Sequence, residues 1–289
     1  MRGFFYMKIS DFKILAGSQL KQKYTASEIS HLVAVLIEER LFMSRLDLIR
    51  EGDFKLSEEA ESTLKRDVEL LREDKPIQYI IGKVNFFGLD IMVNEQVLIP
   101  RSETEELVAL IADDYEQKKD SVARIIDFGT GSACMALAMA KNFSLAKVEA
   151  WDVSKGALVL AQENAILNHL KVDFQLKSIL DAPLEKELKY DLMLSNPPYI
   201  PPSQKQIMEK RVLEYEPDLA LFVEENDPLV FYRAIIEKAE QGLKKGGRLY
   251  FEINQYLAEE TFALFNKGFK AELLKDLNGN WRFIRAEKT

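Results

Sequence analysis

The segment "RIIDFGTGSACMALAMAKN", Arg124 to Asn142, decides the fold of this 289-residue chain. It opens with a short apolar run, passes through a glycine-containing loop, and ends in a stretch with helical spacing of apolar residues. Gly129 and Gly131 let the backbone turn tightly and let a ligand approach the chain without interference from a Cβ atom. A strand, a glycine loop and a helix in this order are typical of the ligand-binding end of an α/β sheet.

Apolar strands and amphipathic helices continue to alternate toward the C-terminus. Further strands are predicted at 147–153, 172–178, 190–196 and 248–254, and helices at 155–169, 232–247 and 257–268. Strands separated by helices of this length need crossover connections, which predicts a mostly parallel sheet. Two last runs, 270–276 and 281–287, predict an antiparallel edge pair. We expect an open, doubly wound, Rossmann-like α/β domain that binds ligands beyond the carboxyl ends of its strands.

Three parts are expected along the chain: a helical bundle (1–75), a hairpin-like connector (76–104) and the α/β domain (105–289). In the bundle, Thr25, Ser27 and Ser57 precede apolar stripes and are candidate N-caps. The connector is rich in β-formers and in turn residues. It ends at Pro100, and a capping box of Ser102 with Glu105 is predicted to open the next helix. The paired glycines at 246–247 are predicted to stop the helix that begins near residue 232.

The composition excludes several classes of protein. Cys134 is the single cysteine, so neither an intrachain disulfide framework nor a multi-cysteine zinc site can form. His31 and His169 lack metal-ligand spacing, and no metal is expected. The formal net charge of −8 argues against bulk nucleic-acid binding. No apolar run approaches the roughly 20 residues of a membrane span, and no signal peptide is evident, so a cytoplasmic protein is expected.

The glycine loop and the strand after it predict the cofactor. Asp152 ends the second strand and lies 152 − 131 = 21 residues after Gly131, the distance expected of an acid that binds a ribose diol. Nicotinamide dinucleotides and S-adenosylmethionine both present such a ribose. The third glycine of the dinucleotide pattern is missing, and Asp127 lies two residues before the loop. A carboxylate is favourable near a sulfonium cation and costly near a pyrophosphate, which favours S-adenosyl-L-methionine.

The segment "LSNPPYI", Leu194 to Ile200, ends the fourth strand of this domain. By itself it fits either a strand-terminating turn or a rigid grip on a small planar polar group. Its position on the rim of the sheet favours the second reading. The Asn196 carboxamide and the Pro197 carbonyl can each accept a hydrogen bond from a substrate NH₂ group, and Tyr199 can cover the substrate. Amino or amide methylation without a metal is the chemistry this predicts.

Taken together, "DFGTGSA", "AWD", "SNPPYI", the connector and "VLEYEPDLALF" resemble the PrmC/HemK family, the protein-(glutamine-N5) methyltransferases of peptide chain release factors. The resemblance implies a class I S-adenosylmethionine-dependent methyltransferase with a seven-stranded sheet, working as a monomer. It implies that Asn196 and Pro197, with Pro198 and Tyr199, hold the glutamine of a Gly-Gly-Gln motif, and that the helical bundle recognises the release factor. Arg101 and Glu103 would lie near the pocket mouth. The implied cofactor contacts are Gly129, Thr130, Gly131, Ser132, Ala133, Asp152, Leu180 and Asn196.

Four positions depart from the family pattern. Ala133 and Asn254 stand where glycines are usual, Ser102 replaces a proline, and Ile179 replaces an acid. Ala133 is expected to crowd the cofactor, and Ser102 to make the connector less rigid. Without the acid, only the apolar face of Leu180 remains for the adenine.

Two other functions stay open at this point. "NPPY" is shared with adenine-N6 methyltransferases, so DNA or RNA is an alternative substrate, which nucleic-acid binding assays would reveal. A non-enzymatic adaptor is the second alternative, and it would fail to bind S-adenosylmethionine.

Overall fold

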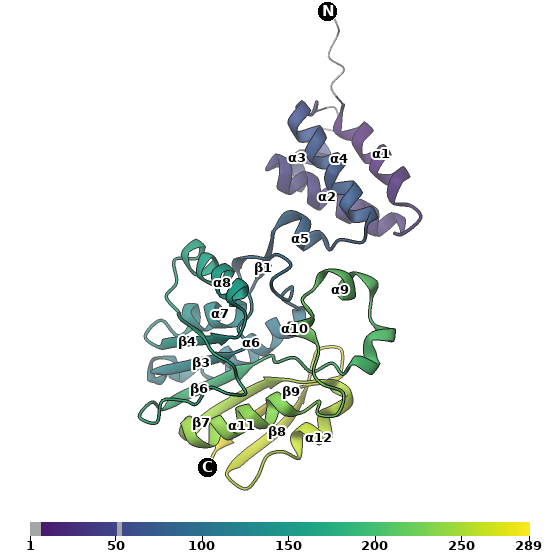
Figure 1. Ribbon diagram of the computed structural model, residues 1–289. Coiled ribbons are helices and arrows are strands. Elements are labelled where there is room, and N and C mark those ends of the chain that lie inside the picture. The colour runs from purple at the N-terminus through teal and green to yellow at the C-terminus, as the bar shows by residue number, and fades with distance from the viewer. Residues whose placement is uncertain (1–6, 51–53) are drawn as a thin grey trace, which may run out of the picture. The chain divides into compact units, whose positions relative to one another are not determined.

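The computed structural model describes residues 7–50 and 54–289 of the chain. It divides into two compact units, Met1–Gly82 and Lys83–Thr289, each with its own core. Figure 1 labels the helices and strands of both units, which are described separately below. No helix among the described residues is both long and apolar enough to cross a membrane.

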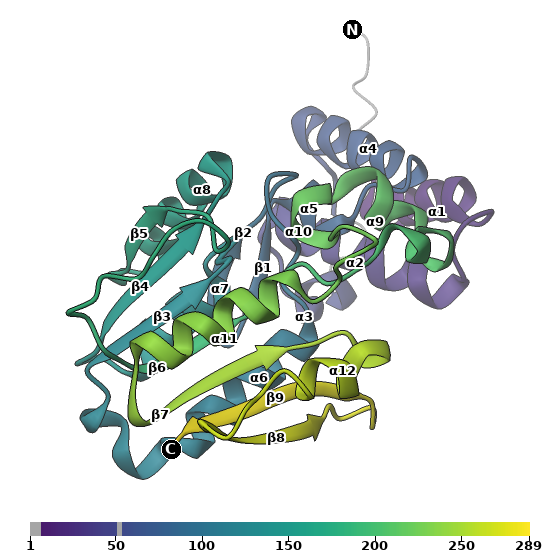
Figure 2. The ribbon, with the colours of Figure 1, turned by 60° about the horizontal axis from the view of Figure 1, so that its bottom comes forward.

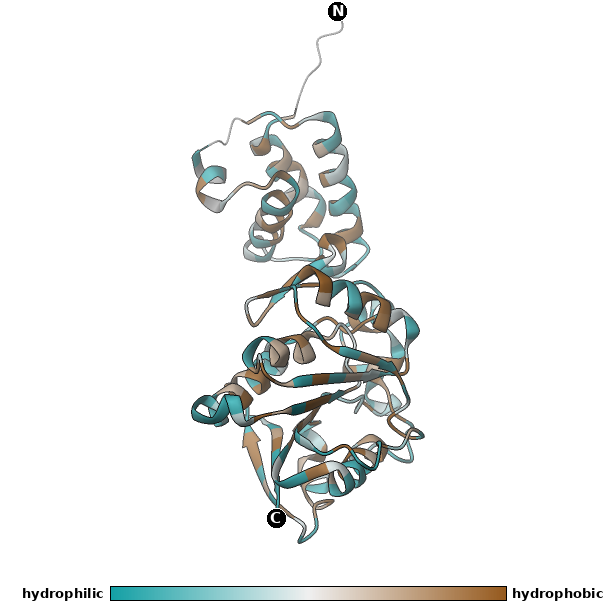
Figure 3. Cartoon of the chain, turned by 90° about the vertical axis from the view of Figure 1, so that its left-hand side faces the viewer, coloured by the Kyte–Doolittle hydropathy of each residue, from teal (hydrophilic) through white to brown (hydrophobic). Residues whose placement is uncertain are grey.

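The first unit is a helical bundle. Its helices are α1 (Ile9–Leu20), α2 (Ala26–Leu41), α3 (Arg45–Arg50), α4 (Glu58–Arg72) and α5 (Ile77–Ile81). Thr25 and Glu28 form a capping box at the start of α2, and Ser57 caps α4, as predicted. Ser27 lies inside α2. The helices show both brown and teal residues in Figure 3, as amphipathic helices do.

Helix α5 follows the expected boundary at residue 75 and belongs to this unit. It packs on α2 and α4, and Ile80 joins the bundle core. The buried Asp67 of α4 accepts a hydrogen bond from Arg40 Nε at 2.7 Å, and Arg40 Nη2 donates to the Ile80 carbonyl at 2.6 Å. One arginine therefore links three helices.

The second unit begins with an antiparallel hairpin, β1 (Lys83–Phe86) and β2 (Leu89–Met92). Phe87 and Gly88 form its turn with φ of 51° and 69°, a two-residue turn that suits the twist of a hairpin. Helix α6 (Ser102–Asp114) follows, but the predicted capping box is wrong. Ser102 is already helical, and the Glu105 carboxylate instead accepts the Phe87 N–H at 2.9 Å. The tertiary contact with the hairpin takes the group that a local cap would have used.

A seven-stranded sheet forms the centre of this unit, in the order β5-β4-β3-β6-β7-β9-β8. The pairs among the first five strands in this order are parallel, and β8 and β9 form an antiparallel pair, as the sequence predicted; β9 also pairs antiparallel with β7. The strands are β3 (Arg124–Phe128), β4 (Lys147–Asp152), β5 (Asp173–Leu176), β6 (Tyr190–Ser195), β7 (Leu243–Glu252), β8 (Phe269–Lys275) and β9 (Trp281–Lys288).

Helices cover both faces of the sheet. Figure 2 shows α11 running across one face with α12 on the same side, while α6 lies on the opposite face. The helices of this domain after α6 are α7 (Cys134–Asn142), α8 (Lys155–Leu167), α9 (Lys210–Tyr215), α10 (Asp218–Leu221), α11 (Val230–Gly242) and α12 (Ala258–Phe262). Three 3₁₀ segments complete it: η1 (Glu116–Ser121), η2 (Pro202–Ile207) and η3 (Gln255–Leu257).

Two predicted helix ends are wrong. Helix α11 ends at Gly242, and the paired glycines lie inside β7, beside an irregular step in its pairing with β6. Gly246 has a φ of 77°, so it serves the irregular strand and does not stop a helix. Helix α12 is much shorter than the predicted 257–268, because the chain turns at residues 263–268 to enter β8.

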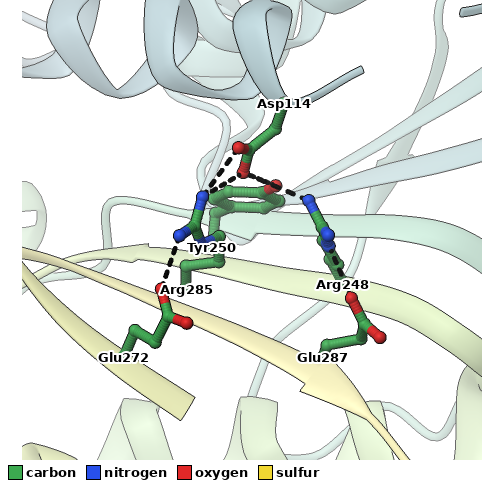
Figure 4. Close-up of polar contacts among 6 residues, drawn as sticks. All are labelled: Asp114, Arg248, Tyr250, Glu272, Arg285 and Glu287. Carbon is green, nitrogen blue, oxygen red and sulfur yellow. Dashed lines mark hydrogen bonds and ion pairs between the residues drawn. The ribbon is translucent and has the colours of Figure 1, made fainter. Parts of the chain in front are cut away.

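A network of charges fixes the end of α6 to the sheet (Figure 4). Asp114 accepts hydrogen bonds from Tyr250 Oη at 2.6 Å and from Arg285 Nη1 at 2.7 Å, and lies 3.3 Å from Arg248 Nη1. Arg248 also pairs with Glu287, and Arg285 with Glu272. These contacts, above all those from Arg285 and Tyr250, outweigh burial and hold the pKa of Asp114 below its ordinary value.

Candidate active site

A cavity of about 390 Å³ lies at the carboxyl ends of β3, β4 and β6, where the topology predicted a ligand site. Its walls come from connector residues 95–100, the glycine loop, the end of β4, residues 177–180, the segment after β6 and residues 217–220. The cavity lies wholly within the second unit. Its size is in the usual range for a small-molecule site.

The glycine loop forms the floor of this cavity. Gly129 and Gly131 have φ of 73° and 54°, and Gly129, Thr130, Gly131 and Ser132 all line the cavity. A Cβ placed on Gly131 would meet no atom within 4 Å, so its backbone borders open space. The N–H groups of Gly129 and Thr130 each donate to the Trp151 carbonyl at 2.9 Å, which ties the loop to β4.

Ala133 has a different place from the one the sequence suggested. It is fully buried at the start of α7, does not line the cavity, and has a left-handed backbone with φ of 64°. Its effect is therefore on the backbone of the loop, since an alanine in this conformation is strained by roughly 1 kcal/mol.

Asp127 lies buried beneath the loop. Its Oδ2 accepts a hydrogen bond from Thr130 Oγ1 at 2.7 Å, while Oδ1 has no partner of normal geometry among the described residues. Burial raises the pKa of Asp127 to about 7, and the charge of Asp152 adds to the effect. Asp127 does not line the cavity, so it acts on the site through the Thr130 hydroxyl and the loop above it.

Asp152 stands at the end of β4, on the rim of the cavity. Its Oδ2 accepts the Gly131 N–H and its Oδ1 accepts the Ser154 N–H, both at 2.8 Å. Burial raises the pKa of Asp152, against these hydrogen bonds from the backbone. The two bonds fix the carboxylate and leave its remaining lone pairs available to hydroxyl groups.

Sequence reasoning missed Asn164, which lies in the middle of α8. It is fully buried, and its Nδ2 donates to the carbonyls of Ser132 and Met92 at 3.0 Å each. Its Oδ1 accepts the Met92 N–H at 2.6 Å. One carboxamide therefore joins the glycine loop, the hairpin and α8. The signal in the sequence that could have indicated this role is a polar carboxamide next to Ala165 and Ile166 in an amphipathic helix.

Residues 177–180 form the apolar side of the cavity. The Ser178 hydroxyl accepts N–H groups from Leu180 and Asp181, so it is used within the turn. Ile179 is buried, and Leu180 lines the cavity with 45% of its surface exposed. An apolar contact is therefore what this turn offers a flat ring.

The segment after β6 brings the Asn196 carboxamide to the cavity. Asn196 and Pro198 line it, whereas Pro197 is buried and Tyr199 is partly buried against the core, and neither is a lining residue. Asn196 Nδ2 donates to Thr104 Oγ1 at 3.1 Å, and the Tyr199 hydroxyl lies 3.4 Å from Glu252 Oε1. Burial raises the pKa of Tyr199 well above its ordinary value, so the hydroxyl stays protonated.

Asn254 holds the same segment from behind. It is buried, and its Nδ2 donates to the Tyr199 carbonyl at 3.1 Å, while its Oδ1 accepts the Tyr256 N–H at 3.0 Å. Its φ of −68° needs no glycine. The departure at this position thus adds a hydrogen bond to the Asn-Pro-Pro-Tyr segment.

Arg101 joins the connector to the segment after α9. Its Nη2 donates to Glu216 Oε1 at 2.5 Å, and Glu216 Oε2 accepts the Ile99 N–H at 3.2 Å. Glu216 is almost fully buried, and Pro217 beside it lines the cavity. Glu103 accepts the Ser102 hydroxyl and does not reach the cavity.

Comparison with known proteins identifies the family. The PrmC N-terminal domain family matches residues 15–82, and the methyltransferase small domain family matches residues 107–215. The release factor glutamine methyltransferase of Flavobacterium psychrophilum is 43% identical over 282 residues, 96% of this chain and 99% of the relative. The chain belongs to the release factor glutamine methyltransferase family.

Other members of the release factor glutamine methyltransferase family support the assignment. The Bacteroides thetaiotaomicron enzyme is 37% identical, covering 93% of this chain and 96% of the relative. The Streptococcus pneumoniae enzyme is 41% identical, covering 84% and 86%. The cofactor of this methyltransferase is S-adenosyl-L-methionine.

One solved structure bears on the fold alone. The hMettl16 catalytic domain, in complex with the MAT2A 3′UTR hairpin 1, is 18% identical with a TM-score of 0.54, covering 90% of each chain. The class I, Rossmann-like architecture predicted from the sequence is confirmed.

Proposed function

We propose that this protein transfers a methyl group from S-adenosyl-L-methionine to the side-chain amide nitrogen, N5, of the glutamine in the Gly-Gly-Gln motif of peptide chain release factors. The observation that carries the proposal is the Asn196 carboxamide at the glycine-loop cavity, in a chain of this family. Its Nδ2 is engaged by Thr104, and no hydrogen bond to its Oδ1 occurs among the described residues. The free oxygen is an acceptor for an amide N–H.

The residues around the cavity fit the cofactor. When bound, S-adenosylmethionine supplies an electrophilic methyl group on a cationic sulfur. Asp152, which lines the cavity, suits its ribose hydroxyls, while Asp127 lies buried beneath the loop. Leu180 offers an apolar face to the adenine. The backbone of residues 129–132 would hold the part between ribose and carboxylate.

The substrate amide is held by acceptors from the segment after β6. Asn196 Oδ1 and the Pro197 carbonyl accept its two N–H groups, which fixes the plane of the amide and turns one face of its nitrogen toward the cavity. An amide nitrogen is a poor nucleophile, so this alignment carries much of the rate. Pro198 contacts the substrate side chain, and Tyr199 supports the segment from the core side.

The remaining parts follow from the same proposal. The helical bundle, expected as residues 1–75 and extended by α5 to Gly82, binds the release factor away from its glutamine. The rest of the expected connector, up to residue 104, leads into the methyltransferase domain, residues 105–289. The enzyme works as a cytoplasmic monomer on a protein and not on nucleic acid, which accords with its net charge of −8. Light scattering of the purified protein tests the monomer.

Methyl transfer to a purified release factor tests the function. Labelled S-adenosylmethionine is supplied, and mass spectrometry locates the methyl group. We expect it on the Gly-Gly-Gln glutamine, with at least a hundredfold loss of rate in Asn196→Ala. Asn142→Ala is the matched control, because Asn142 bonds only within α7 and lies outside the cavity. Wild-type protein that binds the cofactor but leaves the glutamine unmodified contradicts the proposal.

A further inference from the structure

Two buried polar residues stand in line behind Asn196. Thr104 comes from the first turn of α6 and Glu252 from the end of β7, and they are 3% and 2% exposed. Asn196 Nδ2 lies 3.1 Å from Thr104 Oγ1, and Thr104 Oγ1 lies 2.6 Å from Glu252 Oε2. Three segments far apart in the sequence thus form one chain of hydrogen bonds that ends at the cavity.

The direction of each bond in this chain is determined by its protons. A threonine hydroxyl has one proton, and an ionised carboxylate can only accept. Thr104 therefore donates its proton to Glu252 in a short, charge-assisted bond. Toward Asn196 its oxygen can then only accept, so the NH₂ group of Asn196 must face Thr104. The carboxamide oxygen is left on the other side.

The orientation of this carboxamide decides which substrate group it can hold. With Oδ1 free, Asn196 accepts N–H from a glutamine amide. If the Asn196 carboxamide turned over, its NH₂ group would face the substrate NH₂ group, and two donors cannot form a hydrogen bond. A glutamate carboxylate offers only acceptors, so it cannot bond to a free Oδ1. A site built for a polar group rejects an analogue that leaves it unpaired.

We propose that Thr104 and Glu252 are positioning residues that fix the direction of the Asn196 carboxamide and thereby select glutamine over glutamate. The inference rests on the proposed function, since it concerns the same amide. Neither residue has to touch the substrate glutamine to act in this way. Thr104 also lines the cavity, so the control of Asn196 is applied directly at the site.

The charge of Glu252 keeps the direction of the hydrogen bonds from Asn196 to Thr104 and from Thr104 to Glu252. Burial raises the pKa of Glu252 to about 7, while the Thr104 hydrogen bond and the charge of Arg282 lower it and Glu103 raises it. The protonated Tyr199 hydroxyl lies 3.4 Å from the Glu252 carboxyl, and the protonated Tyr232 hydroxyl donates to the Glu252 backbone carbonyl at 3.2 Å. Once protonated, Glu252 can donate to Thr104, whose own proton can then turn toward Asn196. The carboxamide is then free to turn over.

Thr104→Val tests the inference, because valine has the shape of threonine without the hydroxyl. We expect kcat for release-factor methylation to fall about ten- to a hundredfold, as for the loss of one hydrogen bond at a partly buried site. The affinity for S-adenosylmethionine, measured by calorimetry, stays within about twofold. Thr104→Ser restores the rate. Thr261→Val is the matched control, because Thr261 is equally buried and hydrogen-bonded in α12.

Two further readouts separate positioning from structural damage. Wild-type kcat falls as the pH drops below about 7, where Glu252 becomes protonated. In Glu252→Gln the amide can donate to Thr104 at every pH, so we expect most of the rate to be lost and this acid-side fall in kcat to disappear. A short Gly-Gly-Glu peptide, which lacks the surface that the bundle binds, does not compete with the matching Gly-Gly-Gln peptide in the wild type, but competes better in Thr104→Val.

Each outcome decides the matter. Thr104→Val at the wild-type rate, or a Glu252→Gln variant that keeps both its rate and its acid limb, overturns the inference and leaves the proposed function standing. An equal loss in Thr261→Val also overturns it. Wild-type protein without any glutamine methylation overturns the proposed function itself. If Thr104→Val fails to fold, Thr104→Ser and the pH profile of the wild type decide.

Discussion

Asp127→Asn gives a direct measure of the charge beneath the glycine loop. Asp127 is fully buried, and burial raises its pKa to about 7 from the ordinary 3.8. Between these two values the folded protein holds a proton that the unfolded chain has lost, so the free energy of unfolding falls as pH rises. About three pKa units correspond to roughly 4 kcal/mol, the full loss being reached above pH 7. This is opposite in sign to an ordinary ion-paired aspartate.

Urea unfolding from about pH 5 to about pH 8 measures the effect. Asp127→Asn keeps an acceptor for Thr130 and adds an unpaired N–H, which costs about 1–3 kcal/mol at every pH. The readout is therefore the slope. Between the ends of this range we expect wild type to lose roughly 3 kcal/mol relative to the variant.

The matched control is Asp114→Asn. Its pKa is lowered in the fold, chiefly by Arg285 and Tyr250 acting against burial. Its contribution to stability is therefore present above its unfolded pKa, and is lost only as pH falls through the folded pKa. Asp114→Asn lowers the stability without a slope in this range. Parallel curves for wild type and Asp127→Asn would refute the reasoning about burial.

Three further predictions concern two residues near the site and the charge network of Asp114. Ala133→Gly removes the strain of the left-handed alanine, so we expect the free energy of unfolding in urea to rise by about 1 kcal/mol at unchanged m. No rise in the free energy of unfolding contradicts this. Asn254→Gly leaves the Tyr199 carbonyl without its bond, so we expect a loss of about 1–2 kcal/mol and slower methyl transfer; a wild-type rate contradicts this. Asp114→Ala lowers the free energy of unfolding, measured by thermal unfolding, by about 2 kcal/mol. Glu69→Ala, which removes an exposed ion pair with Arg72, lowers it by under about 0.5 kcal/mol, and equal losses refute the prediction.

Local patterns were enough to predict the architecture. The alternation of strands and helices predicted the parallel sheet, and the runs 270–276 and 281–287 predicted the antiparallel pair at its edge. Asp152, expected from its distance to Gly131 to bind a ribose diol, lines the cavity and accepts the Gly131 N–H, and its contact with a ribose stays a prediction. These successes rest on rules that act within about 20 residues along the chain.

Contacts between distant segments could not be predicted in this way. Thr104 and Glu252 are 148 residues apart, and nothing near either one indicates the other. Glu105 lies three residues after Ser102, as in a capping box, yet its carboxylate accepts the N–H of Phe87 in the hairpin turn. The paired glycines have the sequence of a helix stop, yet β7 begins before them, at Leu243. In each case the position was decided by a partner that the local pattern does not contain.

The sheet itself sets the distance between the two halves of the active site. Phe128 and Ser195 are register partners on the adjacent strands β3 and β6, and the Ser195 hydroxyl also donates to the Phe128 carbonyl at 2.6 Å. The glycine loop and the Asn-Pro-Pro-Tyr segment therefore leave the sheet side by side, about 4.8 Å apart. This separation cannot change unless backbone hydrogen bonds break. Residues 201–215, none of which lines the cavity, can thus change in length while the reacting groups keep their spacing.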